Sequence, residues 1–212
     1  AHIDVQLGRL VMRMIHMGLI RNTWFVFVAD HGEMMGDHHQ FKKGSALEGS
    51  ARIPLIIAPP RGVHQEGLVT VDSPVSHYDL MPTLLDIAGA ETPESVDGRS
   101  LSPILNREAP EPAWREYIHG EHAYRNDDAV QYVTDGKEKL IWQPVSGREL
   151  FFDLVRDPGE TRNRVDDPEY TDRVTLWRNR LIKELASRPE DGLSDGERLI
   201  SGKAPPIVRQ PH

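Results

Sequence analysis

The chain has 212 residues, of which 33 are acidic and 25 are lysine or arginine, and it contains no cysteine. Its length suits one medium-sized domain or one larger and one smaller unit. The acidic balance argues against a general nucleic-acid or membrane-surface binder, because no basic patch dominates, and the lack of cysteine excludes a disulfide framework and a cysteine nucleophile.

The first predicted element is a helix from Ile3 to about Met17. Its apolar residues recur at the spacing of one helical face, and they are Ile3, Leu7, Leu10, Val11 and Met14. Gly18 is expected to end this helix. Because a domain seldom begins inside an element, we expect the chain to be the carboxyl-terminal part of a longer protein. No apolar run approaches the roughly 20 residues of a membrane span. The location is expected to be the cytoplasm or the periplasm, and we favour the cytoplasm.

Two continuous apolar runs follow, Trp24 to Ala29 and Ile53 to Ala58. Such runs are typical of strands buried on both faces, so we predict a parallel pair within a larger sheet that helices and further strands cover.

The first run stops at Asp30 and His31. Ligands of open α/β sheets lie beyond the carboxyl ends of the strands, so this carboxylate and this imidazole are placed to touch a substrate or a metal ion. Gly32 then allows a tight turn of the backbone.

A shorter helix is predicted after Asp79, which is a suitable N-cap, with Pro82 in its first turn and Gly89 at its end. The prolines from Pro103 to Pro112 are typical of a linker. We therefore predict two units, with residues 1–112 as part of an α/β catalytic domain and residues 113–212 as a small α+β subdomain with an extended tail.

The second unit is predicted to be an antiparallel meander packed with one helix. Short runs rich in β-branched and aromatic residues are separated by turn residues; they are Tyr117 to Glu121, Ala129 to Thr134, Glu138 to Gln143 and Arg148 to Leu154. Pro168 suits the first turn of a final helix. The buried stripe of that helix is predicted to be Val174, Trp177, Leu181 and Leu185. The tail from Glu190 onward is expected to follow the surface.

Three ordered segments resemble the sulfatase family of the alkaline phosphatase superfamily. The first is DHGEMMGDH from Asp30 to His38, followed by Lys43, Glu48 and the string ARIPLII; the others are SHYDLMPTLLDIAGAETPESVDGRSLSPIL and ELFFDLVRDPGETRN. The resemblance covers most of the chain. It implies an α/β, alkaline-phosphatase-like mixed sheet flanked by helices, of which this chain holds a part. It also implies hydrolysis of a sulfuric ester of a small molecule or a sugar.

The resemblance implies that Asp30 and His31 are metal ligands and that two further carboxylates come from an earlier strand. Ca²⁺ and Mg²⁺ prefer oxygen ligands, while an imidazole admits Mn²⁺ or Zn²⁺. We expect Ca²⁺, with Mn²⁺ and Mg²⁺ as alternatives. Without the resemblance, Asp30 would be interpreted as a cap of the turn and His31 as an ordinary hydrogen-bonded histidine.

Lys43 matches the family's lysine that contacts the sulfate oxygens, and a compact ammonium suits an anionic tetrahedral group. A loop register shifted by one residue would give this role to Lys42. Asp37 and His38 are expected to shape the loop through side-chain hydrogen bonds to the backbone. His39 stands where the family commonly has glycine.

Other residues near these motifs receive structural interpretations. Glu48 and Arg52 are expected to form an ion pair or a loop anchor. His77 and His119 are interpreted as surface or core histidines. His122 is the one histidine of this group that we place at the rim of a pocket.

The family's nucleophile is a cysteine or serine in a C/S-x-P-x-R string that is converted to formylglycine. This chain has no cysteine, and its one Ser-x-Pro, from Ser187 to Pro189, has Asp191 at the arginine position. We therefore expect the formylglycine outside these residues and the chain alone to be inactive. Three functions remain open: a metal-dependent sulfatase, a phosphodiester or phosphonate monoester hydrolase of the same superfamily, and a non-catalytic remnant or binding module.

Overall fold

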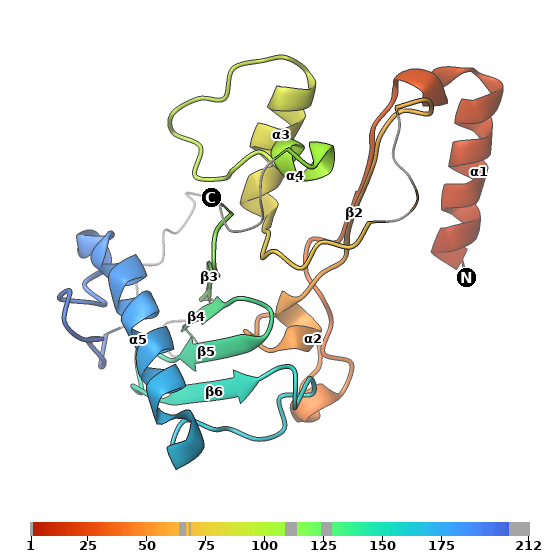
Figure 1. Cartoon of the computed structure of the whole chain (residues 1–212). Coiled ribbons are helices and arrows are strands. Elements are labelled where there is room, and N and C mark those ends of the chain that lie inside the picture. Colours follow the sequence, from red (N-terminus) through yellow and green to blue (C-terminus); the bar gives the residue numbers. More distant parts are fainter. Residues whose placement is uncertain (1, 64–66, 68, 109–113, 124–128, 204–212) are drawn as a thin grey trace, which may run out of the picture.

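The computed structural model describes residues 2–63, 67, 69–108, 114–123 and 129–203. Figure 1 shows three regions along the chain: a helix and a hairpin arm at the amino-terminal end, two shorter helices in the middle, and a sheet with one long helix toward the carboxyl-terminal end. None of the helices in these ranges has both the length and the apolar character needed to cross a lipid bilayer.

The amino-terminal region begins with α1 (His2–His16), which confirms the predicted helix. Gly18 follows it with a φ of 72°, a conformation that glycine adopts without strain. The apolar face of α1 is exposed within the described chain, because Ile3 and Leu10 keep 68% and 53% of their surface accessible. The described residues therefore leave this face uncovered.

A two-stranded sheet follows, made of β1 (Phe25–Val28) and β2 (Leu55–Ala58). The two strands pair antiparallel, so the predicted parallel pairing is wrong. A parallel pair needs a crossover of a dozen or more residues, usually a helix, that returns the chain to its starting end. The longest α-helix between these strands is α2 (Glu48–Ala51), a single turn, and the chain reverses direction instead. Phe27 and Ile56 are exposed, so the described chain does not cover both faces of the pair.

The middle region contains α3 (Leu80–Ile87), which confirms the helix predicted after Asp79. The Asp79 side chain does not cap this helix. Its carboxylate is buried, accepts hydrogen bonds from the backbone amides of Ser76 and Arg99, and pairs with Arg115 at 2.6 Å. Asp79 therefore joins three separate segments of the chain.

The stretch predicted to be a linker contains a short helix, α4 (Ser102–Asn106). Pro103 occupies its first turn, where the missing N–H leaves no helical hydrogen bond unmade. The predicted boundary between the two units falls among residues 109–113, which lie outside the described residues, and it stays a prediction.

The carboxyl-terminal region is a four-stranded antiparallel sheet in the order β3-β4-β5-β6. Its strands are β3 (Ile118–His122), β4 (Val130–Thr134), β5 (Glu138–Trp142) and β6 (Glu149–Asp153). A 3-10 turn that begins at Pro168 leads into α5 (Thr171–Ala186). The predicted meander and the predicted final helix are both confirmed. In its described part the tail follows the surface as predicted, except at Leu193, which is fully buried in the core.

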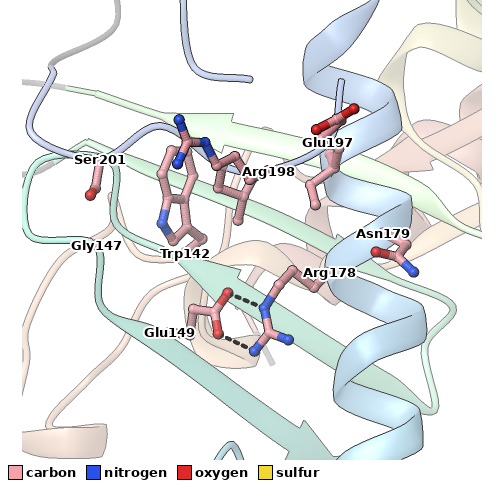
Figure 2. A pocket seen from close by; sticks show the side chains of 10 residues that line it. Trp142, Gly147, Glu149, Arg178, Asn179, Glu197, Arg198 and Ser201 are labelled. Carbon is pink, nitrogen blue, oxygen red and sulfur yellow. Dashed lines mark hydrogen bonds and ion pairs between the residues drawn. The ribbon is translucent and has the colours of Figure 1, made fainter. Parts of the chain in front are cut away.

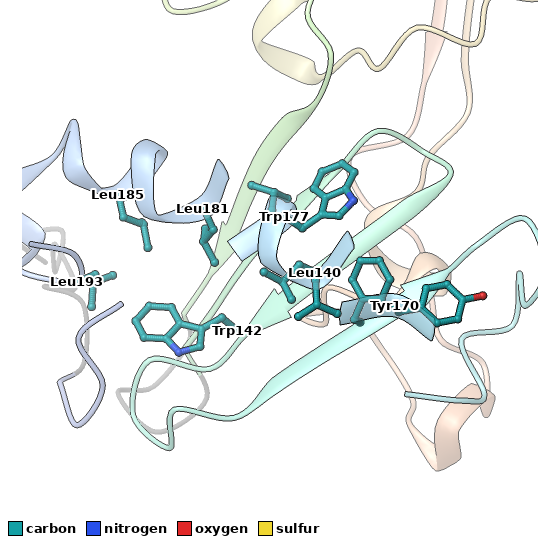
Figure 3. Close-up of a cluster of buried hydrophobic side chains, with 10 residues drawn as sticks. Leu140, Trp142, Tyr170, Trp177, Leu181, Leu185 and Leu193 are labelled. Carbon is teal, nitrogen blue, oxygen red and sulfur yellow. The ribbon is translucent and has the colours of Figure 1, made fainter. Parts of the chain in front are cut away.

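α5 covers one face of this sheet. Arg178 of α5 donates to Glu149 of β6 through two nitrogens, at 2.8 and 2.6 Å (Figure 2). The apolar cluster between the helix and the sheet contains the whole predicted stripe (Figure 3). Its buried members are Val133, Leu140, Trp142, Phe151, Tyr170, Val174, Trp177, Leu181, Leu185 and Leu193. Each large side chain of this kind stabilises the fold by about 1.5–3 kcal/mol when fully buried.

The opposite face of the sheet packs against the loop between β1 and β2. Side chains alternate along a strand, so Leu140 and Trp142 of β5 face α5, whereas Lys139 and Ile141 face the loop. A second cluster joins this face to the loop, and it consists of Met34, Ala46, Leu47, Val130, Ile141, Phe152 and Leu154. The sheet is thus a layer between α5 and the loop, and α2 lies on the side away from α5 (Figure 1).

Candidate active site

β1 ends just before two of the predicted site residues, Asp30 and His31. The His31 backbone amide donates a 2.9 Å hydrogen bond to Asp30 Oδ1, and His31 Nδ1 lies 2.8 Å from the Gly32 carbonyl oxygen. A carbonyl oxygen can only accept, so this hydrogen bond places the ring proton on Nδ1. In the neutral ring, Nε2 is then the free base, and it lies 3.4 Å from Asp30 Oδ2. The structure therefore brings the two predicted ligands together.

This donor set fits half of a divalent-cation site. A metal-bound histidine commonly donates its other ring N–H to a carbonyl or a carboxylate, as His31 does to Gly32. The Asp30 side chain is 86% exposed, so an ion can reach it. Within the ranges that the structure describes, no three His, Asp or Glu side chains gather as a metal site. A complete set of ligands would need groups from outside them.

The pKa of the Asp30 carboxyl lies below its ordinary value. The largest cause is the hydrogen bond from the His31 backbone amide, followed by an electrostatic contribution from the His31 side chain, and Lys43 adds a smaller electrostatic contribution. Each of these effects favours the ionised carboxylate. Asp30 therefore has the anionic form that a metal ligand needs.

Contacts on both sides hold the backbone around Asp30. His77 Nε2 donates to the Ala29 carbonyl oxygen at 2.8 Å, so this histidine supports the end of β1. On the other side, the Gly32 amide donates to the Ser50 carbonyl oxygen at 2.8 Å. A Cβ on Gly32 would lie 2.1 Å from the Gly49 carbonyl oxygen. Glycine is needed at this position because two backbone segments approach closely there.

Lys43 lies on an exposed part of the loop, next to the equally exposed Lys42. The following residue, Gly44, has a φ of 92° and packs against a histidine of β3, because a Cβ on Gly44 would lie 2.8 Å from His122 Nε2. The structure thus places His122 beside the residue that follows Lys43. Its predicted role at the rim of a pocket stays a prediction.

The loop backbone is strained at several positions. Met35, His38, His39 and Lys42 adopt φ values between 50° and 71°, a left-handed region that costs energy for residues other than glycine. The glycine that the resembled family commonly has at the position of His39 would adopt this conformation without that cost. His38 Nε2 donates to the Gly159 carbonyl oxygen at 2.9 Å. This contact is of the kind predicted for His38, and it ties the loop to the carboxyl-terminal region.

Sequence reasoning misses two residues that hold the loop, Lys139 and Glu160. Lys139 is fully buried, and its Nζ donates to the Ala46 carbonyl oxygen at 2.8 Å, to Glu48 Oε1 at 2.6 Å and to Glu160 Oε1 at 3.0 Å. A lysine that follows the charged residues Lys137 and Glu138 just after a hairpin turn is normally exposed. The alternation of side chains along β5 is the signal that could have identified Lys139. Both faces of this strand carry apolar residues, so a lysine on the same face as Ile141 must be buried and needs hydrogen-bond partners.

Glu48 is the residue on which these contacts converge. It forms the predicted ion pair with Arg52 at 3.5 Å, although Lys139 is its nearer partner. Its backbone amide donates to Glu160 Oε2 at 2.6 Å. Asn163, three residues beyond Glu160, accepts a hydrogen bond from the Phe151 amide at 2.8 Å. This hydrogen bond joins the segment that carries Glu160 to β6. The segment ELFFDLVRDPGETRN therefore presents Glu160 to the loop.

A separate hollow of about 300 Å³ lies between α5 and the strand ends of the sheet (Figure 2). Trp142 forms part of its wall, and its two cations are paired: Arg178 with Glu149, and Arg198 with Asp195 at 3.0 Å. Because these charges are neutralised, the hollow is a poor site for an anionic substrate. The loop after β1 remains the better candidate.

Known families and proteins show what this chain is similar to. Residues 36–187 match the family described as N-sulphoglucosamine sulphohydrolase, C-terminal. The chain belongs to this family of sulfatase carboxyl-terminal regions. It is 43% identical over 203 residues to an arylsulfatase of Clostridium perfringens, an alignment that covers 95% of this chain and 41% of the relative. The chain spans about a third to two fifths of the length of the curated relatives that it matches.

Solved structures show the same fold. The chain resembles BT4656, solved in complex with its substrate D-glucosamine-2-N,6-O-disulfate, with a TM-score of 0.74 and 28% identity over 92% of this chain and 40% of that one. It also resembles the phosphonate monoester hydrolase of Agrobacterium radiobacter, with a TM-score of 0.73 and 27% identity over 99% of this chain and 43% of the other. These likenesses confirm the predicted fold class.

Proposed function

We propose that the chain forms the carboxyl-terminal part of a sulfatase that hydrolyses a sulfuric ester of a small molecule or a sugar with the help of a divalent cation. The observation that carries this proposal is the pairing of Asp30 and His31 at the end of β1, with Oδ2 and Nε2 3.4 Å apart. The likeness to an arylsulfatase supports it. The disulfated sugar bound to BT4656 supports a sugar sulfate as the class of substrate.

In this proposal Asp30 and His31 hold the cation, which we propose to be Ca²⁺, with Mn²⁺ or Mg²⁺ as alternatives. Such a cation, when bound, polarises the oxygens of the ester as a Lewis acid. Lys43 binds the nonbridging sulfate oxygens, because an ammonium can stabilise the negative charge that develops during S–O cleavage. The formylglycine nucleophile and the remaining ligands lie outside these 212 residues.

A phosphodiester or phosphonate monoester hydrolase is the second candidate. The likeness to the hydrolase of Agrobacterium radiobacter favours it, and His31 supplies an imidazole of the kind that Mn²⁺ accepts. The third candidate is a non-catalytic binding module that keeps the fold without the reaction.

The test is turnover by the enzyme expressed from the complete reading frame, with the 4-nitrophenyl esters of sulfate and of phenylphosphonate as parallel substrates. The proposal expects hydrolysis of the sulfate ester, lost after treatment with a chelator and restored by Ca²⁺ or Mn²⁺. Faster hydrolysis of the phosphonate ester would favour the second candidate. No turnover of either ester would favour the third.

A further inference from the structure

We propose that Lys139 is a positioning residue for this site: its buried ammonium fixes α2, and α2 in turn fixes both Lys43 and the turn that carries Asp30 and His31. The inference rests on the proposed function, which gives those three residues their roles. Lys139 is fully buried, so it acts through the loop and not on the ester itself.

Three oxygens enclose the Lys139 ammonium, and two of them belong to the loop. An ammonium has three N–H donors, and the oxygens of Ala46, Glu48 and Glu160 provide one acceptor for each, at 2.8, 2.6 and 3.0 Å. The side chains of Lys139 and Glu160 are 0% and 2% exposed. Charges buried to this degree depend on one another, because removing one leaves the others uncompensated.

From Glu48 the contacts continue to the lysine side of the site. Glu48 is the first residue of α2, and Ser50 in the same turn is buried. Ser50 Oγ accepts hydrogen bonds from the backbone amides of Gly44 and Ser45, at 3.1 and 3.3 Å. Gly44 directly follows Lys43, so α2 sets the position of the backbone from which Lys43 extends.

The same helical turn also reaches the metal-ligand side. The Ser50 carbonyl oxygen accepts a hydrogen bond from the Gly32 amide at 2.8 Å, and Gly32 directly follows His31. Ser50 therefore connects through its side chain to the residue after Lys43 and through its backbone to the residue after His31. A shift of α2 would change the spacing of groups that act on one ester, and a misplacement of about 1 Å can cost roughly 100-fold in rate.

The loop needs an anchor because its backbone does not favour the observed conformation. His39 and Lys42 have φ values of 58° and 71°, and such conformations persist only where surrounding contacts hold them. Without the Lys139 ammonium, we expect the loop to relax toward lower-energy backbone angles and to carry Lys43 away from its position.

The test is steady-state kinetics of the complete enzyme with Lys139→Met, which keeps much of the side-chain length and removes the charge. We expect kcat to fall by about 10- to 100-fold. The same substitution should lower kcat by a smaller factor in a Lys43→Ala background, because only its effect through the turn of Asp30 and His31 then remains and the two substitutions are not additive. Arg178→Met is the matched control. It removes a cation paired with Glu149 on the other face of the sheet and should leave kcat unchanged.

Glu160→Gln is the second variant, since Lys139→Met leaves two carboxylates without their cation and can prevent folding. Glutamine keeps the volume but has one acceptor oxygen, where Glu160 uses one oxygen for Lys139 and the other for the Glu48 amide. We expect a smaller fall in kcat, with faster amide hydrogen exchange at Gly44 than in the wild type.

Failure of this inference and failure of the proposed function give different results. If Lys43→Ala leaves turnover unchanged, the proposed role of Lys43 is wrong and the inference falls with it. If Lys43→Ala lowers turnover while Lys139→Met and Glu160→Gln keep the wild-type kcat, Lys139 does not position Lys43. An equal fall in kcat with and without Lys43 would also overturn the inference.

Discussion

Asp30 and His31 lie side by side, but they are expected to respond differently to substitution. Asp30→Ala removes a charged ligand and should abolish turnover of the complete enzyme. His31→Asn should retain partial activity, because an amide oxygen can still bind a hard cation. The measurement is kcat together with the metal content of each purified variant.

Asp86 provides the control for this pair of variants, because it is an exposed carboxylate that accepts a hydrogen bond from Ser100. Asp86→Ala should leave both turnover and metal content unchanged. A metal-bound structure with Asp30 and His31 outside coordination distance would contradict the assignment.

Lys43 and Lys42 are adjacent and exposed, so substitution can tell their roles apart. A single donor to a developing oxyanion is worth about 3–4 kcal/mol in other enzymes, so Lys43→Ala should lower turnover by roughly 100- to 1,000-fold. Lys42→Ala should act as a surface change, within about 0.5 kcal/mol in stability. Steady-state kinetics and melting temperatures of both variants check this. Damage by Lys42→Ala alone would show that the loop register is shifted by one residue.

At the scale of elements, local patterns predict the carboxyl-terminal region well. Alternating apolar residues and turn residues define β3 to β6, and the 3.6-residue period defines the buried stripe of α5. The pairing of β1 with β2 is predicted in the wrong direction, because an apolar run shows that a strand is present but not which way its neighbour runs. The fold of the loop between them depends on the rest of the chain.

The contacts of Lys139 show why the site is only partly predictable. Motif resemblance predicts Asp30, His31 and Lys43 as site residues, and these lie close together in sequence. Lys139 and Glu48 are 91 residues apart, and Glu48 and Glu160 are 112 apart. No local period links residues at such separations, so their contact appears only when the sheet packs against the loop.

Tyr117 connects the strand region to α5 and predicts a pH dependence. Its hydroxyl donates to Glu184 Oε1 at 2.9 Å. The pKa of Tyr117 is raised from 10.0 to about 12. Burial is the largest cause, and the hydrogen bond to the Glu184 carboxylate is the second. Between these values the folded protein keeps a proton that the unfolded chain has lost, so the contribution to stability is complete below pH 10 and is lost as the pH rises toward 12.

Urea unfolding between pH 9 and pH 12, roughly the range in which tyrosine titrates, tests this dependence. The unfolding midpoint of the wild type should fall as the pH rises, and the fall should be smaller for Tyr117→Phe. Tyr78→Phe is the control, since Tyr78 is 66% exposed, and it should keep the wild-type slope. Equal slopes for all three proteins would contradict the role of Tyr117.

At the scale of the whole molecule, we predict that the 212-residue chain alone has no sulfatase activity and is only marginally stable. The proposed site has two ligands from this chain, and the apolar face of α1 is uncovered in the described chain, with Ile3 and Leu10 exposed. Hydrolysis of 4-nitrophenyl sulfate and the free energy of unfolding in urea are the measurements. Turnover above a blank by the purified chain would contradict the prediction.

The sheet lies between α5 and the loop, so substitutions at neighbouring residues of β5 should affect different properties of the protein. Leu140 and Trp142 contact α5, so substitutions there should mainly lower the abundance of folded protein. Lys139 and Ile141 contact the loop, so substitutions there should also lower the specific activity of the molecules that fold. A scan of every substitution along this strand would then show specific activity varying with a two-residue period.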